Sequence, residues 1–189
     1  MSSTFFSGRC SLDYVGTVGW RRSHEPREFL AEPSDLATWA TTKGLVDEPP
    51  RVTPAQLACA REIREAIYRV LSARVAHVIP TAADVAALNT AAQRPPVQIS
   101  LGTDGSVHRV GTVSQLLSTV ARDVLDLLGS DQIDLVRECD GHDCTRLYVD
   151  SSRARNRRWC SNTGCGNRAK VSAFRERARE SISSTEHSH

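Results

Sequence analysis

The sequence lacks three features that would indicate a secreted, membrane-bound or enzymatic protein. No apolar run approaches the length that a transmembrane helix needs, and the N-terminus has no signal-peptide core. No group of carboxylates and histidines suggests catalysis. Lysine is also scarce, since arginine outnumbers it twenty-two to two. We therefore expect a cytoplasmic protein that is not an enzyme and does not associate with membranes.

The composition is otherwise ordinary for a globular protein. The 189 residues are 40% hydrophobic and 24% charged, which is enough to form a core. The net charge of +2 is unevenly distributed: residues 139–180 hold ten basic and five acidic residues, whereas residues 1–138 hold fourteen and sixteen. The excess positive charge therefore belongs to the C-terminal stretch, although arginine is common throughout the chain.

Four cysteines dominate that stretch. Cys139 and Cys144 form one pair, Cys160 and Cys165 the other, and fifteen residues separate the pairs. Zn²⁺ prefers sulfur and nitrogen ligands in a closed tetrahedral shell, so the spacing predicts one structural zinc ion held by all four. Two disulfides are the alternative, which a reducing cytoplasm disfavours. We interpret His142 as a surface turn residue.

Most of residues 1–130 has the pattern of amphipathic helices. Four helix starts are predicted from capping residues, at Ser34, Thr53, Thr81 and Thr112. Apolar residues then recur at spacings of three and four, which predicts buried faces. These faces comprise Leu57, Ala60, Ile63, Ile67, Val70 and Leu71; then Val85, Leu88 and Ala92; then Val113, Leu116, Leu117, Val120, Val124, Leu127 and Leu128. The charged residues of the longest helix are assigned to its solvated face.

Two shorter elements complete this region. Val97 to Leu101 alternates apolar and polar residues, Asp104-Gly105 supplies a turn, and Val107 to Val110 follows, which predicts a β-hairpin. Near the N-terminus, Leu12 to Val18 forms a short strand or a first helix whose apolar side chains enter the core.

The C-terminal stretch resembles a known family. Cys165-Gly166-Asn167-Arg168, preceded by Arg157-Arg158-Trp159-Cys160-Ser161, is similar to the CGNR zinc finger of bacterial transcription regulators, over about residues 133–180. The resemblance implies binding to double-stranded DNA. The order of a cysteine knuckle, a hairpin and a helix from Asn167 to about Arg179 also resembles a treble-clef finger.

The N-terminal stretch resembles the ABATE domain that precedes such fingers and is thought to sense a small ligand. The similarity lies in Leu12-Asp13-Tyr14-Val15-Gly16-Thr17, in the following Arg21-Arg22, and in Pro33 to Trp39. It implies ligand contacts from Asp13, Thr17, Arg21 and Trp39, with Arg21 facing an anionic group. The family usually has asparagine where this chain has Gly16. From the residues alone, the same positions form the edge of a core.

Basic residues mark a candidate DNA footprint. They lie in the loop before Trp159 and on the following helix: Arg153, Arg155, Arg157, Arg158, Arg168, Lys170, Arg175 and Arg177. Arginine suits phosphate oxygens and the edge of guanine. The alternative is that some of them pair within the module, with Asp140, Asp143, Asp150 or Glu176.

These observations predict a mainly α protein with a small β-hairpin (α+β). Residues 1–130 form a helical, ligand-sensing domain, residues 131–180 a treble-clef-like four-cysteine zinc finger, and residues 181–189 a disordered tail. The predicted function is that of a zinc-containing, DNA-binding transcription regulator with a small-molecule effector. A protein-interaction adaptor, in which the basic module contacts an acidic protein, is the first alternative; an enzyme is the second.

Overall fold

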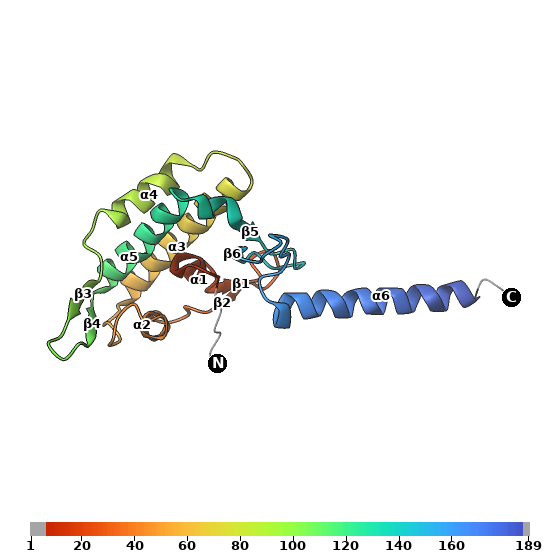
Figure 1. Ribbon diagram of the computed structural model, residues 1–189, viewed down its shortest axis with the longest axis horizontal. Helices are drawn as coiled ribbons and strands as arrows, with labels where there is room; N and C mark the ends of the chain where they lie inside the picture. Colours follow the sequence, from red (N-terminus) through yellow and green to blue (C-terminus); the bar gives the residue numbers. More distant parts are fainter. Residues whose placement is uncertain (1–6, 187–189) are drawn as a thin grey trace.

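The computed structural model describes residues 7–186 and confirms the mainly helical fold (Figure 1). The helices are α1 (Cys10–Val15), α2 (Pro33–Thr42), α3 (Pro54–Val75), α4 (Ala82–Ala92), α5 (Val113–Leu128) and α6 (Asn167–Glu186), with short helical turns at Asp131–Leu135 (η1) and Asn162–Gly166 (η2). The strands form antiparallel pairs: β1 (Val18–Gly19) with β2 (Arg27–Glu28), β3 (Gln98–Leu101) with β4 (Val107–Val110), and β5 (Val136–Glu138) with β6 (Leu147–Val149). The predicted hairpin is the second pair.

Local capping explains where the helices begin. The hydroxyls of Thr53, Thr81 and Thr112 each accept a hydrogen bond from a backbone N–H in the first turn of their helix, as predicted. The predicted cap at Ser34 is wrong. Pro33 already occupies the first helical position, and Glu32 is the N-cap, its backbone N–H bonded to the Asp35 carboxylate at 2.8 Å.

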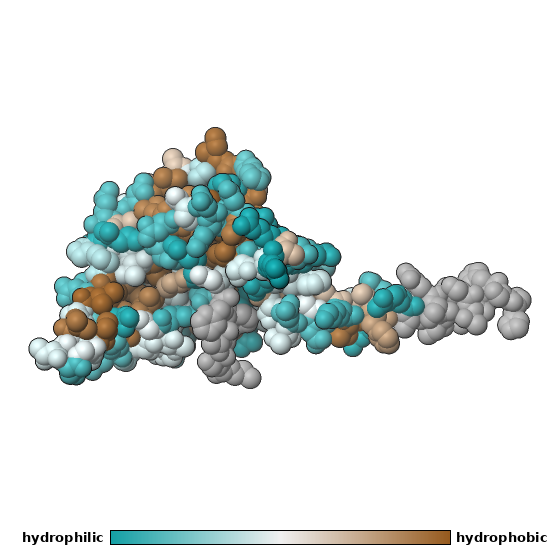
Figure 2. All heavy atoms as spheres, viewed as in Figure 1, coloured by the Kyte–Doolittle hydropathy of each residue, from teal (hydrophilic) through white to brown (hydrophobic). Residues whose placement is uncertain are grey.

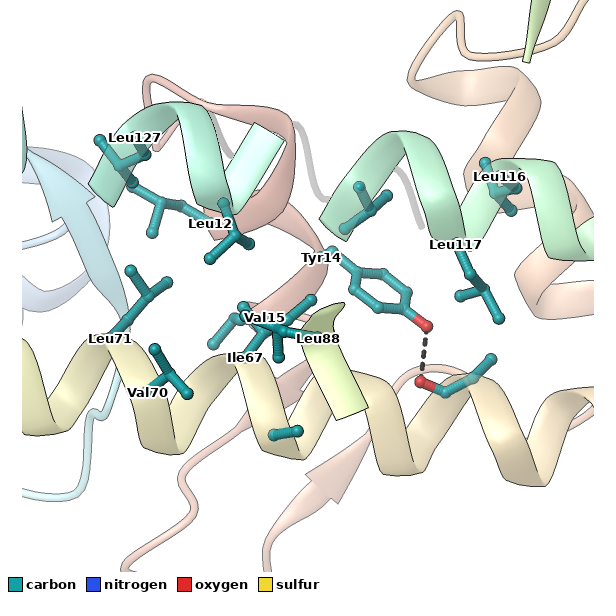
Figure 3. Packing of buried hydrophobic residues seen from close by; sticks show 14 of the residues in the cluster. Leu12, Tyr14, Val15, Ile67, Val70, Leu71, Leu88, Leu116, Leu117 and Leu127 are labelled. Atoms are coloured by element: carbon teal, nitrogen blue, oxygen red, sulfur yellow. Dashed lines mark hydrogen bonds between the residues drawn. The ribbon is translucent and has the colours of Figure 1, made fainter. Parts of the chain in front are cut away.

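The core forms where α1 lies against α3 and α5 (Figure 3). Leu12, Tyr14 and Val15 are completely buried, and the Tyr14 hydroxyl donates to the carbonyl oxygen of Ala60 at 2.7 Å. Burying one large apolar side chain contributes about 1.5–3 kcal/mol, so these residues anchor the short first helix. The predicted apolar faces are largely buried, but Val85 on α4 is 37% exposed; it lines a surface hollow together with Val78 and Leu125, which are exposed as well.

The charged side of α3 differs from the prediction at one position. The Arg64 side chain is only 3% exposed, and it donates to both carboxylate oxygens of Glu28 at 2.7 Å and to Glu65 at 2.8 Å. Arg21 donates to the same Glu65 carboxylate at 3.2 Å. The β1–β2 ribbon covers this face of α3 and brings a carboxylate to it, so the arginine is buried and paired.

The third hairpin joins the C-terminal stretch to the main core. Ile133, Val136, Leu147 and Val149 belong to the same buried cluster as α1, α3 and α5. The backbone N–H of Val149 also donates to the Ser7 carbonyl oxygen at 2.9 Å. The boundary predicted at residues 130–131 stays a prediction, and the core continues across it.

The last helix, α6, extends away from this body (Figure 1). It continues to Glu186, past the end predicted near Arg179, because neither glycine nor proline interrupts residues 167–186. Residues 181–186, predicted as disordered tail, are thus helical, while residues 187–189 with both terminal histidines lie outside the described residues. No helix within residues 7–186 is both long and apolar enough to span a bilayer.

Candidate zinc centre and basic surface

The four predicted cysteines converge at the base of α6. Their sulfur atoms all lie within 4.8 Å of one another. Cys160 Sγ lies 3.8 Å from Cys144 Sγ and 3.7 Å from Cys165 Sγ. A tetrahedron with zinc–sulfur bonds of about 2.3 Å has edges of about 3.8 Å, so the cluster fits one Zn²⁺. Such a shell leaves no position for water, which makes the centre structural.

The first pair is held at the tip of the β5–β6 hairpin. The N–H of Cys139 donates to the Arg146 carbonyl oxygen at 3.0 Å. The N–H of Cys144 donates to the Gly141 carbonyl oxygen at 2.9 Å. A Cβ atom at Gly141 would lie 3.1 Å from both Cys144 Cβ and Cys165 Sγ. Glycine is therefore needed here to let the two cysteine loops approach each other; we call Cys139–Cys144 the first knuckle and Cys160–Cys165 the second.

The second pair leads directly into α6. The Ser161 hydroxyl accepts from the N–H of Gly164 at 3.1 Å, and the Ser161 carbonyl oxygen accepts from Gly166 at 2.9 Å. These bonds close the tight turn η2 around Cys165. The orientation of α6 at its first turn is thus set by the same residues that hold the cluster together.

The electrostatics of the cluster favour a cation. Hydrogen bonds from the Cys144 and Cys160 thiols lower the pKa of Cys139 to about 2. The same hydrogen bonds raise the pKa of Cys144 to about 12 and also raise that of Cys160, because each of these thiols donates to the Cys139 sulfur; repulsion between neighbouring thiolates adds to both shifts. A divalent metal ion cancels this repulsion, so zinc binding would release protons from the remaining thiols.

Two arginines lie beside the sulfur cluster. Arg168 Nη2 donates to Cys165 Sγ at 3.0 Å, and its guanidinium lies 5.8 Å from the centre of the Trp20 ring. Burial lowers the pKa of Arg146, while Cys160, Cys144, Cys165 and Asp13 all favour its charged form. Four thiolates and one Zn²⁺ carry a net charge of about −2, which these cations offset.

Arg157, predicted as a DNA contact, is used inside the finger. Its guanidinium donates to the carbonyl oxygens of Trp159, at 2.8 Å, and Cys160, and it lies 4.4 Å from the centre of the Tyr148 ring. The Tyr148 hydroxyl donates to the Arg157 carbonyl oxygen at 2.6 Å. The backbone N–H of Arg157 donates to Asp150 at 2.9 Å. These interactions brace the second knuckle and were not recognisable from the arginine-rich sequence.

The other predicted DNA contacts divide into paired and unpaired residues. Arg158 is paired with Asp140 at 2.8 Å, one of the internal pairings that the sequence left open. His142, interpreted as a turn residue, has a side chain that is 96% exposed. Five basic residues are exposed and form no ion pair with the part of the chain that the structure describes: Arg153, Arg155, Lys170, Arg175 and Arg177. Their contact with DNA stays a prediction.

Three of the four predicted ligand contacts are hydrogen-bonded or ion-paired within the protein, whereas the buried Trp39 Nε1 has no hydrogen-bond partner among the described residues. Asp13 forms an ion pair with Lys43 at 2.8 Å, and the Thr17 hydroxyl donates to the Tyr14 carbonyl oxygen at 2.6 Å. Arg21 donates to Glu65 and lies 4.3 Å from the centre of the Tyr68 ring. The Trp39 ring lies 4.9 Å from that of Tyr14. A ligand role for these residues stays a prediction, and their contacts match the alternative interpretation as a core edge.

Residues of the β1–β2 connection also contact the finger, which no sequence pattern predicted. Trp20 lies next to Arg168, and Arg22 forms an ion pair with Glu138 on β5. Trp20, the first knuckle and the first turns of α6 line a cavity of about 490 Å³. The N-terminal part and the finger therefore also meet through polar contacts, in addition to the apolar core that they share. Contacts between segments so far apart in sequence leave no local pattern.

Comparison with protein families matches both parts of the chain. A model named ABATE, described as "putative stress-induced transcription regulator", matches residues 8–131. A second model, the CGNR zinc finger, matches residues 136–178, which include all four cysteines. No curated protein matches the chain.

Proposed function

The chain belongs to the ABATE family of transcription regulators and ends in a CGNR zinc finger, and we propose that it regulates transcription by binding double-stranded DNA through that finger. Residues 131–180 form the DNA-binding module in this proposal, with Cys139, Cys144, Cys160 and Cys165 as the ligands of one structural zinc ion. Residues 1–130 form the sensing domain. The family description is that of a regulator, not of an enzyme.

The observation that carries the proposal is the set of basic residues near the zinc centre that form no ion pair within residues 7–186. Arg153 and Arg155 lie in a loop that contains no acidic residue, and Lys170, Arg175 and Arg177 lie on the exposed surface of α6. Cations without an acidic partner can neutralise phosphates and release counterions, which is the main source of affinity for DNA.

The placement of α6 suits insertion into a groove. The helix is attached at the zinc centre and extends into solvent, and its apolar residues Val171 and Phe174 are 41% and 67% exposed. A B-DNA major groove is about 12 Å wide and admits one α-helix. In this arrangement α6 contacts base edges through Arg175 or Arg177, and the loop with Arg153 and Arg155 contacts the backbone.

The role of zinc follows from the geometry. The metal fixes η2 and the first turn of α6, so it sets the direction of the helix relative to the basic loop. Arg168 and Arg157 have positioning roles in this scheme, because both contact the knuckles. Zinc supplies structural stability here, and the exposed arginines supply the binding.

Sequencing of genomic DNA fragments retained by the purified, zinc-loaded protein tests the proposal. We expect the retained fragments to share a short sequence, and retention to disappear after zinc is removed. Retention of no DNA at low salt would contradict the proposal. In that case, zinc-dependent capture of an acidic protein would favour the adaptor alternative.

A further inference from the structure

A groove that the sequence did not indicate lies between α3, α4 and α5; part of the surface of these helices is visible in Figure 2. It has a volume of about 550 Å³, within the range of small-molecule sites. Alanines on α3 and α4 form its walls, and the buried side chains of Val113 and Leu117 on α5 form much of its floor. The space exists because Ala66, Ala83, Ala87 and Ala91 present only methyl groups where larger residues would close the gap between the helices.

The two ends of the groove differ in charge. At one end, Asp84 accepts hydrogen bonds from Arg69 at 2.6–3.0 Å, and burial of this carboxylate is compensated by the arginine. That end is therefore neutral overall. The Arg69 charge is held by its partner and is not available to a ligand.

The opposite end carries an uncompensated positive charge. Arg94, just beyond the end of α4, lines the groove and forms no ion pair within residues 7–186. The Ser118 hydroxyl donates to the Arg94 carbonyl oxygen at 2.6 Å, which holds this residue against α5. The first turn of α5, with Val113 and Ser114, lines the same end. The N–H of Gln115 in this turn is capped by the Thr112 hydroxyl, whereas the N–H groups of Val113 and Ser114 have no partner within the helix and add partial positive charge.

Between the ends, Glu62 on α3 lines the exposed rim. A carboxylate at this position repels a second negative charge in the middle of the groove. The combination of an apolar floor, one cationic end and an acidic rim selects for a single terminal charge. It disfavours a dianion and a fully polar ligand.

We infer that this groove binds a small monocarboxylate with an apolar body, whose carboxylate meets Arg94 and the start of α5 and whose apolar part lies over Ala66, Ala87 and Leu117. The inference rests on the proposed sensing role of residues 1–130 and gives that role a site and a ligand class. It places the ligand away from Asp13, Thr17, Arg21 and Trp39, whose polar groups lie inside the protein.

The test uses the full zinc-loaded chain and two probe pairs, octanoate with 1-octanol and benzoate with benzyl alcohol. Titration followed by ¹H–¹⁵N NMR should give saturable shifts for octanoate or benzoate at residues of α3, α4 and the first half of α5. Each neutral alcohol should bind about tenfold more weakly, since it lacks the charge-assisted hydrogen bond. Phthalate, a dianion, should bind more weakly than benzoate.

Variants with matched controls locate the site. Ala87→Leu fills the groove and should reduce octanoate binding at least about tenfold, while Ala86→Leu on the exposed side of α4 should not. If Ala87→Leu does not fold, Ala83→Leu at the open edge makes the same test. Arg94→Gln should remove the preference for octanoate over 1-octanol, and Arg27→Gln, with the same loss of charge on β2, should preserve it.

The outcomes separate the site from the function. Octanoate shifts that map to the groove and vanish in Ala87→Leu support the binding site. If octanoate binds there but leaves the affinity for DNA unchanged, the sensing role is overturned and the binding site is not. Absence of saturable binding by either carboxylate overturns the site. Shifts centred on Trp39, or wild-type affinity in both Ala87→Leu and Ala83→Leu, overturn it as well.

Discussion

Arg168 Nη2 donates a hydrogen bond to Cys165 Sγ at 3.0 Å, so the last residue of the Cys-Gly-Asn-Arg sequence contacts the metal centre that the first one helps to form. This hydrogen bond raises the pKa of Arg168, which stays charged. The pair explains how a centre with a net charge of about −2 is stabilised at the start of a helix that carries further positive charge.

We predict that Arg168→Ala weakens zinc binding by about tenfold or more, which is the usual effect of removing a residue that supports a metal ligand. Arg168→Lys should restore part of the affinity, because it keeps the charge but not the planar geometry. Competition with a coloured chelator measures the zinc dissociation constant of each variant. Unchanged zinc affinity in Arg168→Ala would show that this hydrogen bond has no role in metal binding.

Alanine substitution should reduce stability strongly at Arg157 and hardly at all at Arg153. Arg157→Ala removes hydrogen bonds to two carbonyl oxygens and the packing against Tyr148, and it should destabilise the finger by about 2–3 kcal/mol. Arg153→Ala, in the exposed part of the same loop, should change stability by less than about 0.5 kcal/mol. Thermal unfolding with zinc content measured in parallel checks this, and equal stabilities would refute the bracing role.

The Arg64 network predicts a loss of stability in acid. Burial alone would raise the pKa values of Glu28 and Glu65. Hydrogen bonds and charge from Arg64 outweigh burial at Glu28, and those from Arg21 and Arg64 outweigh it at Glu65, so both pKa values are lowered from the ordinary value of 4.5. Groups with a lowered pKa stabilise the fold above their unfolded value, so this contribution is complete above about pH 4.5 and is lost as the pH falls through the lowered values.

Arg64→Met tests this network. It removes the buried partner of Glu28 and one of the two arginine partners of Glu65. The free energy of unfolding should fall by about 3 kcal/mol near neutral pH, the low end of the range for breaking a buried ion pair, because both carboxylates are about one-third exposed. The stability of the variant should also vary less between pH 5 and pH 3 than that of the wild type. Chemical unfolding at each pH gives both quantities, and a wild-type pH profile in Arg64→Met would contradict the assignment.

Zinc removal should affect the chain unevenly. Structural zinc in small modules supplies about 10–16 kcal/mol of apparent free energy, so chelation should expose residues 139–166 and the start of α6 to hydrogen exchange. The amides of α3 and α5 should stay protected, because their core contains no metal ligand. Equal loss of protection in α3 would show instead that the core depends on the metal.

Local features of the sequence predicted most of the fold. Thr53, Thr112 and the apolar spacing that follows them determine α3 and α5, since capping and periodicity act within one or two turns of helix. The spacing of the four cysteines likewise predicted the metal centre. By contrast, the ion pair of Arg64 with Glu28 joins residues 36 apart, and no local pattern indicates it.

The roles of the basic residues were also not predictable from local sequence. Arg153, Arg157 and Arg168 have the same side chain in one arginine-rich segment, yet one is exposed, one braces a knuckle and one contacts a thiol. Which role each takes depends on where the loop and α6 leave the zinc centre. The groove lined by Arg94 was missed for a related reason, because alanines on two helices look like ordinary helix-forming residues until the helices are placed side by side.

The salt dependence of DNA binding in Arg153→Ala/Arg155→Ala tests whether the basic loop before Trp159 is part of the DNA-binding surface. Arg27→Ala/Arg51→Ala, which removes two exposed charges from the N-terminal part, is the control. Fluorescence anisotropy with zinc-loaded proteins should show weaker binding of the loop variant to every duplex. The slope of log affinity against log salt should flatten by about 1.8, or 0.9 for each phosphate that is no longer neutralised, and the control should retain the wild-type slope. A loop variant with wild-type affinity and slope, at full zinc content, would contradict the claim that this surface binds DNA.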